Sequence, residues 1–153
     1  MRHVVGWLSL LVFALAAFGQ ADERAVTYYV QLVRGTDGDK PPAPACRPAG
    51  PRLVATFRPV MKWKNYWEIS CKSVTLNTGQ TSRIRLGNGR EVEIDLRLAN
   101  KRQVTAYQDG VMVDRTISPL GASMTITGGD RDPQSVWFIV VRRDKPSAPK
   151  DAI

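Results

Sequence analysis

The acidic residues that alternate along one short stretch are the first candidates for chemistry. Glu91, Glu93 and Asp95 are spaced two residues apart, so in a strand they would lie on one face. Glycoside hydrolysis uses a pair of such carboxylates, one as general acid and one as base or nucleophile. A carboxylate-dependent hydrolase is therefore one function to weigh against a structural role for the same residues.

The register of the surrounding hairpin favours the structural role. Residues 81–96 read as two strands, and Ile84 must face Val92 if the apolar side chains are to share the buried side. That pairing requires a three-residue loop, Gly87-Asn88-Gly89, with its last glycine in the left-handed conformation. On the other face it sets two pairs of opposite charge, Arg85 with Glu91 and Arg83 with Glu93. We therefore predict a solvated ladder of charges and no catalytic residue.

The position of histidine excludes several kinds of site. His3 is the only histidine, and it falls in a segment that we expect to be removed. Without histidine a protein builds neither a Ser-His-Asp nor a Cys-His mechanism, and it has no imidazole ligand for zinc. Serine and lysine are frequent, but no spacing singles out a Ser-Lys pair, so a Ser/Lys-dependent hydrolase is a minor alternative. We expect no enzyme activity and no cofactor.

Two acidic pairs in turn-forming stretches raise the question of calcium: Asp37-Gly38-Asp39 and Asp130-Arg131-Asp132. A calcium loop of the EF-hand type needs further oxygen ligands and a closing glutamate, which neither stretch supplies. Aspartate and glycine also favour turns for conformational reasons. We predict turns at both places and no metal site.

The two cysteines, Cys46 and Cys71, are 25 residues apart. In an exported protein such a pair favours a disulfide bond, and free buried thiols are the alternative. The spacing is far from C-x-x-C, so a redox-active pair is not expected. We predict a disulfide between Cys46 and Cys71.

The stretch MKWKNYWEISC, residues 61–71, combines aromatic rings with lysines. If its second half is a strand, Trp67 shares a face with Ile69 and Cys71, while Tyr66 points to the other face. We predict that Trp67 belongs to the core and that Tyr66 faces solvent. Trp63 and Lys64 precede the strand, so the predicted binding residues are Trp63, Lys64 and Tyr66.

The first residues have the layout of a secretory signal peptide: Arg2, then an apolar run to about Phe18, then small residues before Asp22. The apolar run is shorter than the roughly 20 residues that span a bilayer. We predict a signal peptide over residues 1–21 and a protein that is exported, periplasmic or extracellular. The chain carries a net charge of +8, and loss of Arg2 would leave 21 basic against 14 acidic residues, a net charge of +7.

The rest of the chain reads as short strands joined by turns. Residues 52–61 favour a short helix between Pro51 and Pro59, although their apolar residues also alternate as in a strand. Near Lys72 and Ser73 the apolar pattern changes parity, which predicts a bulge or a break. The strand patterns cover residues 25–33, 67–71, 74–76, 81–86, 90–96, 102–108, 111–117, 123–127 and 135–141, the last apolar on both faces and therefore central.

These elements predict a mainly β fold, an antiparallel β-sandwich or small barrel of about eight strands with one short helix. We place a single β domain at residues 22–142. It includes a proline- and glycine-rich loop at 35–51, and a disordered tail follows at 143–153.

The order of several landmarks is similar to that of an uncharacterised class of small exported bacterial proteins. They span roughly Leu53 to Val141 and comprise Trp63-Lys64-x-Tyr66, Val74-x-Leu76, Ile84-x-Leu86, Val92 to Leu96, Gly128-Gly129-Asp130 and Trp137-Phe138. The resemblance implies a small β-rich envelope module, and it brings no known active site.

These features predict a non-catalytic, exported binding module. Its partner would be an envelope or secretion-associated protein, reached through a sheet edge or a basic face. The alternative is a carbohydrate-binding sandwich that recognises an anionic polysaccharide through exposed aromatic and basic residues. We expect neither a nucleic-acid partner nor, after removal of the signal peptide, a transmembrane helix.

Overall fold

The computed structural model describes residues 24–129 and 133–147, which form two antiparallel sheets and a helix, α1 (Pro51–Phe57). The larger sheet has the strand order β2 (Arg47–Pro48), β3 (Asn65–Leu76), β1 (Val26–Thr36), β9 (Ser135–Arg142) and β8 (Met124–Thr127). The smaller sheet has the order β4 (Thr81–Gly87), β5 (Arg90–Asp95), β6 (Lys101–Gln108) and β7 (Val111–Pro119). The predicted antiparallel sandwich with one short helix is confirmed.

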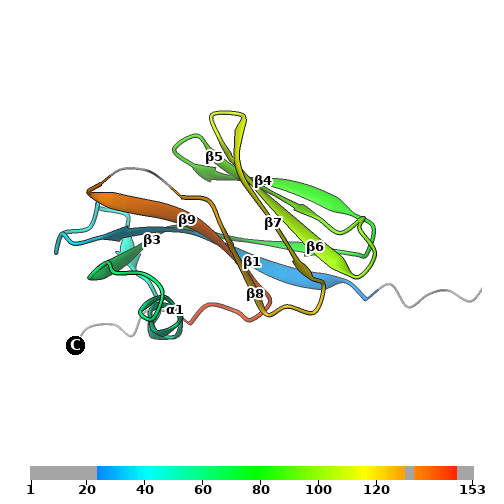
Figure 1. Cartoon of the computed structure of the whole chain (residues 1–153), viewed down its shortest axis with the longest axis horizontal. Helices are drawn as coiled ribbons and strands as arrows, with labels where there is room; N and C mark the ends of the chain where they lie inside the picture. The colour runs from blue at the N-terminus through cyan, green and yellow to red at the C-terminus, as the bar shows by residue number, and fades with distance from the viewer. Residues whose placement is uncertain (1–23, 130–132, 148–153) are drawn as a thin grey trace, which may run out of the picture.

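The five-stranded sheet is the middle layer of the molecule. Figure 1 shows the four-stranded sheet on one of its faces and α1 on the other. Between the sheets lies a large apolar core that includes Tyr28, Val92 and Ile139. A second core lies under α1, where the Phe57 ring stands 4.6 Å from the ring of Phe138, measured between centroids. The predicted central strand, β9, therefore has both faces covered.

Helix α1 is short because prolines bound it. Pro51 occupies the first turn, where its fixed φ is suitable and its missing N–H is no loss. The helix ends at Phe57, before Pro59, which has no N–H to continue the hydrogen-bond ladder. Leu53 and Phe57 lie one turn apart and are both buried against the sheet. Burial of each contributes roughly 1.5–3 kcal/mol, so the helix is held mainly by its packing.

The β4–β5 hairpin has the predicted register, with Ile84 opposite Val92 and the two charged pairs opposite each other. The turn differs in detail. Gly87 pairs with Arg90, so the loop is Asn88-Gly89 and the extra residue is a bulge at Leu86. Asn88 and Gly89 have φ values of 53° and 71°, as a type I′ turn requires. The prediction used a three-residue loop to bring Ile84 opposite Val92. The bulge at Leu86 gives the same pairing with a two-residue loop.

Strand β3 contains a second bulge, at Ile69. Leu32 of β1 faces Ser70, whereas the next residue, Val33, faces Glu68, so Ile69 is the extra residue. The predicted change of pleat is present but lies at Ile69 and not at Lys72–Ser73. Ile69 packs on the core between the sheets, while Glu68 faces the side of the sheet that carries α1.

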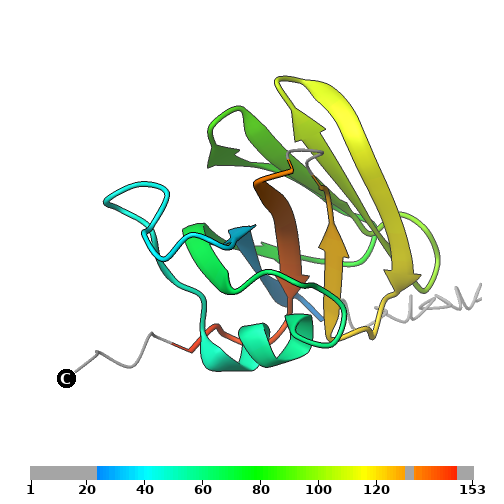
Figure 2. The ribbon, with the colours of Figure 1, turned by 60° about the vertical axis from the view of Figure 1, so that its left-hand side comes forward.

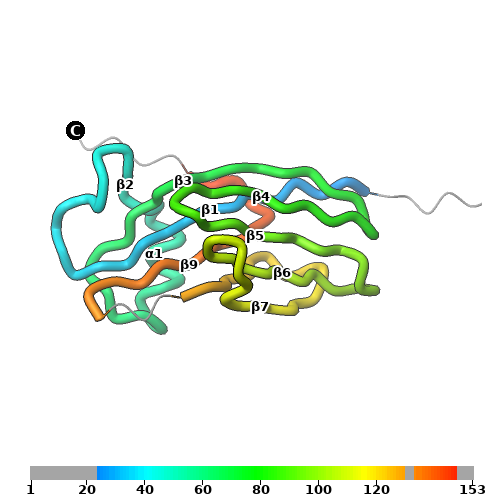
Figure 3. The backbone as a smooth tube through the Cα atoms, turned by 90° about the horizontal axis from the view of Figure 1, so that it is seen from above, coloured from blue at the N-terminus to red at the C-terminus, as the bar shows by residue number. Residues whose placement is uncertain are grey.

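The β4–β5 and β6–β7 turns lie side by side. The Asp109 amide donates a 2.8 Å hydrogen bond to the Gly89 carbonyl. Figure 2 shows both turns directed away from the five-stranded sheet, with β7 at the edge of its sheet. The loop that follows β1 (cyan) lies at one end of the molecule (Figure 3). It is shorter than predicted, because β1 continues to Thr36 and β2 pairs with β3 from Arg47.

The chain after β9 continues along the domain as far as the structure describes it. The Arg143 amide donates a 3.1 Å hydrogen bond to the Ser123 carbonyl, and the Ser147 carbonyl lies next to Gly50. Residues 143–147, predicted as part of a disordered tail, thus have defined contacts. The predicted signal peptide, the acidic pair at 130–132 and residues 148–153 lie outside the described residues. Within the described ranges, no helix has the length and apolar character needed to cross a membrane.

Candidate functional site

Tyr66 is buried, so the prediction that it faces solvent is wrong. The residue is 4% exposed, and its ring centroid lies 5.2 Å from that of Phe57 on α1. Its hydroxyl donates a 3.2 Å hydrogen bond to the Met61 carbonyl. Burial raises the pKa of the Tyr66 phenol. The physical reason is α1, which covers the face of the sheet that alternation alone assigns to solvent.

The other two predicted binding residues, Trp63 and Lys64, are only partly accessible to a ligand. Trp63 is half-buried and lies on the backbone of Gly35, where an added Cβ would come within 2.9 Å of the indole. Lys62 places its Nζ 5.9 Å from the centroid of the Trp63 ring. Lys64 is exposed, and its amide donates a hydrogen bond to the Asp37 carboxylate. The structure thus brings Trp63 and Lys64 together at the start of β3 without forming a platform of two rings.

The Asp37-Gly38-Asp39 turn is hydrogen-bonded to the start of β3. The Asn65 side-chain amide donates to the Gly38 carbonyl at 2.9 Å and to the Asp39 carboxylate at 3.3 Å. Groups of three or more residues able to hold a metal ion are absent from the part of the chain that the structure describes. Trp67, predicted to lie in the core, is half-buried beside Pro48 of β2, and it belongs to neither apolar core.

The prediction of a disulfide is wrong, because both cysteines are free thiols. The register explains why. Arg47 faces Glu68, so Cys46 comes level with Ile69 and not with Cys71, two residues further along β3. Diagonal neighbours of this kind stand about 7–8 Å apart, whereas a disulfide needs Cα atoms within roughly 7 Å. Burial raises the pKa of the Cys71 thiol, which disfavours the reactive thiolate.

Two of the three alternating carboxylates, Glu91 and Asp95, are bonded to arginines. Glu91 accepts hydrogen bonds from the Nε atoms of Arg83 and Arg85, each at 3.0 Å. These contacts lower the pKa of Glu91, and the hydrogen bond from Arg83 has the largest effect. Arg83 thus bonds diagonally to Glu91, although its backbone faces Glu93, and its guanidinium lies 3.7 Å from the centroid of the Tyr107 ring.

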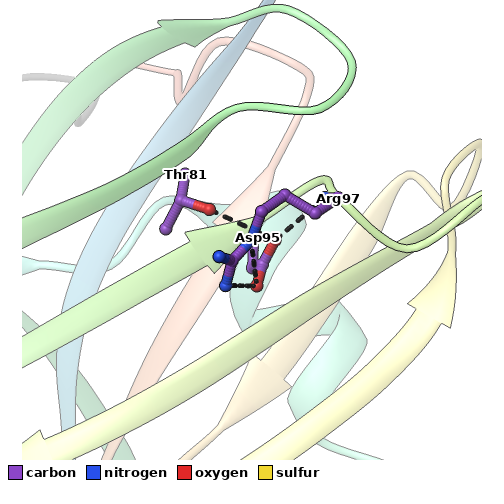
Figure 4. Close-up of polar contacts among 3 residues, drawn as sticks. All are labelled: Thr81, Asp95 and Arg97. Carbon is purple, nitrogen blue, oxygen red and sulfur yellow. Dashed lines mark hydrogen bonds and ion pairs between the residues drawn. The ribbon is translucent and has the colours of Figure 1, made fainter.

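Asp95 is the most constrained of these carboxylates (Figure 4). It is 5% exposed and accepts hydrogen bonds from the backbone amide, Nε and Nη2 of Arg97, of which the shortest is 2.7 Å, and one from the Thr81 hydroxyl at 3.2 Å. These contacts, led by the Arg97 side chain, lower the pKa of Asp95 from 3.8 to about 2. A carboxyl group with this pKa is ionised at neutral pH, so it has no proton to donate as a general acid.

Glu68 is a buried acid that alternation assigns to solvent. It is 5% exposed and accepts hydrogen bonds from the Gln31 side chain at 2.5 Å and from Arg47 Nε at 2.7 Å. Gln31 lies on the central strand β1, and Arg47 lies on the short strand β2. The contacts therefore fasten β2 to the sheet and are structural.

An exposed apolar surface on β7 is the clearest candidate for function. We call it the β7 strip. Its side chains, which are 45–67% exposed, are Val111, Met112, Val113 and Ile117. Strand β7 ends its sheet: β6 pairs with one side of it, and no described residue pairs with the other. Native proteins usually protect such edges with charged side chains, proline, bulges or short strands. Strand β7 has a bulge at Val113 and ends at Pro119, but its first three residues carry no charge and stay exposed.

The first part of the strip extends beyond the neighbouring sheet. Further along β7, Asp114 accepts a hydrogen bond from the Thr127 hydroxyl at 2.8 Å, and Thr116 donates to the Ile126 carbonyl at 3.4 Å. These contacts tie the second half of β7 to β8. Residues 111–113 come directly after the β6–β7 turn and before the residues that contact β8. Figure 2 shows this turn projecting past the end of β8.

A bulge determines which side chains of the strip share a face. Met112 faces Tyr107 and Asp114 faces Ala106, so Val113 is the extra residue. After the bulge, Arg115 and Ile117 lie opposite residues 105 and 103 of β6, on the same face as Tyr107. Met112, Arg115 and Ile117 therefore point to the outer face of the four-stranded sheet.

No protein-family model matches the chain, and neither a curated protein nor a solved structure shows significant similarity to it. The function therefore has to be inferred from the geometry of the chain itself, and the β7 strip is the feature that alternation in the sequence does not reveal.

Proposed function

We propose that the protein is a non-catalytic, exported binding module that holds an extended segment of an envelope or secretion-associated protein along β7. The observation that supports this most directly is the run of three exposed apolar residues, Val111 to Val113, on an edge strand. An exposed apolar edge promotes aggregation unless something covers it. A strand from a partner covers it with main-chain hydrogen bonds and side-chain contacts together.

The outer face of β7 indicates the chemistry of the partner segment. Met112 and Ile117 offer apolar contacts, and the exposed Arg115 lies between them. Directly opposite side chains on neighbouring strands share a face. The segment that fits best is extended, with apolar side chains at two positions and an acidic side chain between them, each separated by one residue.

The carbohydrate-binding alternative has less support. Stacking on sugar rings needs exposed aromatic faces, and Tyr66 is buried while Trp63 lies against Gly35. Lys64 remains exposed, but neither Trp63 nor Tyr66 offers an exposed ring face beside it that could orient a saccharide.

The test is site-specific photocrosslinking in cells that produce the full chain. A photoreactive amino acid replaces Met112 in one variant and Val60 in a matched control, since Val60 is 75% exposed but lies on the connection between α1 and β3. We expect one protein to be captured from position 112 and not from position 60, and the attached peptide to have the apolar-acidic-apolar alternation. Equal capture from both positions, or a peptide without that pattern, would refute the proposal.

A charge reversal separates strand addition from a general apolar contact. Arg115→Glu keeps the β7 strip apolar but opposes an acidic partner residue, so crosslinking from position 112 should fall severalfold. Arg58→Glu makes the same charge change at an exposed site after α1 and should leave it unaltered. An equal fall in both variants would show that only the overall charge matters.

Export is part of the proposal and rests on residues 1–21. Fractionation of cells that produce the full chain should place the protein outside the cytoplasm. Sequencing of its first residues should show a start near Asp22. A chain that keeps Met1 and stays in the cytoplasm would contradict this part of the proposal without touching the β7 strip.

A further inference from the structure

A second surface, far from the tip of the β6–β7 hairpin, has the features of an anion site. It is an open cleft of about 870 Å³ on the helix side of the five-stranded sheet. Its polar side chains come from α1, from the connection before β8 and from the end of β9, and they are Arg52, Thr56, Ser123, Arg142, Arg143 and Asp144. We infer that this cleft binds a phosphate group.

Three arginines and one aspartate line the cleft, so its net charge is positive. Arg142 is 4% exposed and donates to the Asp144 carboxylate through Nε at 2.9 Å and through Nη2. This pair neutralises the only carboxylate that lines the cleft. Arg52 and Arg143 are exposed, and neither forms an ion pair within residues 24–129 and 133–147. A concave surface lined by charges of one sign concentrates ions of the opposite sign.

Hydrogen bonds to the backbone fix where Arg52 and Arg143 leave the chain. Arg52 and Thr56 lie one turn apart on α1 and so point to the same side of the helix. The Thr56 hydroxyl donates to the Arg52 carbonyl at 3.0 Å. Arg143 is fixed at its backbone by the hydrogen bond from its amide to the Ser123 carbonyl. The side chains converge on the cleft from two segments that are distant in the sequence.

The number of donors favours phosphate over a carboxylate. Asp144 shows, in the same cleft, that one guanidinium satisfies one carboxylate. Two further guanidinium groups and the Ser123 hydroxyl supply more donors and more charge than a second carboxylate can use. A phosphate or phosphomonoester has the oxygens and the charge to engage both arginines, each through a two-pronged contact.

The test measures binding of inorganic phosphate and of glycerol phosphate to the chain at low salt, by titration calorimetry. Arg52→Gln and Arg143→Gln each remove donors from the cleft. Arg58→Gln is the matched control, because it makes the same change of charge at an exposed arginine that does not line the cleft. We expect each cleft variant to weaken phosphate binding at least about tenfold and the control to weaken it less than about twofold.

Several outcomes would overturn the inference: no binding of phosphate, an equal loss in all three variants, or chloride competing as well as phosphate does. Sedimentation with phosphatidylglycerol vesicles, against phosphatidylcholine vesicles, identifies the source of the phosphate. Vesicle binding that free phosphate displaces indicates a lipid headgroup, and phosphate binding without vesicle binding indicates a small molecule. Crosslinking from Met112 should be unchanged in Arg52→Gln, so this inference and the proposed function can fail independently.

Discussion

Replacement of Asp95 by asparagine gives a direct test of the electrostatics of the four-stranded sheet. Asp95 ends β5, and its carboxylate is bonded to Arg97 two residues later and to Thr81 at the start of β4 (Figure 4). Asparagine keeps the shape of the side chain but removes its charge. It therefore weakens the contacts with Arg97 while it leaves an acceptor for Thr81.

The magnitude follows from the pKa of Asp95, which is lowered from 3.8 to about 2. A difference of one pKa unit corresponds to about 1.4 kcal/mol, so the shift sets an upper limit near 2.5 kcal/mol. The Arg97 side chain is 66% exposed, and solvent screens its charge. We therefore expect Asp95→Asn to lower the free energy of unfolding by about 1–2 kcal/mol at pH 7.

The dependence on pH has a definite sign. Because the folded state lowers the pKa of Asp95, the stabilisation is complete above the unfolded pKa of 3.8 and is lost as the pH falls towards about 2. The assay is urea unfolding of the wild type and of Asp95→Asn between pH 7 and pH 2. We expect the difference between the two proteins to be constant above about pH 5 and to fall to about 0.4 kcal/mol near pH 2, where half of Asp95 is still ionised in the folded state.

Glu93→Gln is the matched control, since it removes a carboxylate from the same strand that accepts no side-chain hydrogen bond among the described residues. It should change the free energy of unfolding by less than about 0.5 kcal/mol. A loss in Asp95→Asn that is as large at pH 2 as at pH 7 would show that shape and not charge is responsible. An equal loss in Glu93→Gln would refute the particular role of Asp95.

Two further predictions concern packing and the thiols. Gly35→Ala should lower the free energy of unfolding by about 1–3 kcal/mol, because its Cβ would lie 2.9 Å from the Trp63 indole; Gly38→Ala, whose Cβ meets only a hydroxyl at 3.5 Å, should be nearly neutral in the same denaturation assay. Titration of the unfolded chain with a thiol reagent, without reductant, should find both Cys46 and Cys71 reactive, and reductant should not change the melting temperature of the folded protein; the absence of both thiols before reduction would restore the disulfide.

The hairpin register was predictable because two independent patterns agree on it. Apolar residues at 84 and 92 must share the buried face, and the arginines and glutamates on the other face then meet in opposite pairs. A one-residue error would place Leu86 opposite a charge, so the sequence excludes it. The short helix was predictable for a similar reason, since Pro51 and Pro59 limit its ends from both sides.

The free cysteines and the burial of Tyr66 could not be predicted, because both depend on contacts between distant segments. The pairing of Cys46 with Cys71 depends on the register of β2 against β3, which two residues of strand do not reveal in the sequence. Tyr66 lies on the face that alternation assigns to solvent, and it is buried because residues 51–57 fold back over that face.

The sequence does not tell what covers each surface. For this reason it reveals neither the burial of Tyr66 nor the exposure of the β7 strip. Periodicity tells which side chains of a strand share a face, but it does not tell the order of strands in the sheet. Residues 111–117 read as a strand like any other, and only the sheet order shows that β7 is an edge with Met112 exposed. The wrong prediction for Tyr66 and the failure to single out β7 therefore have the same cause. For a small sandwich, the residues to examine for binding are the apolar ones that the sheet order leaves at an edge.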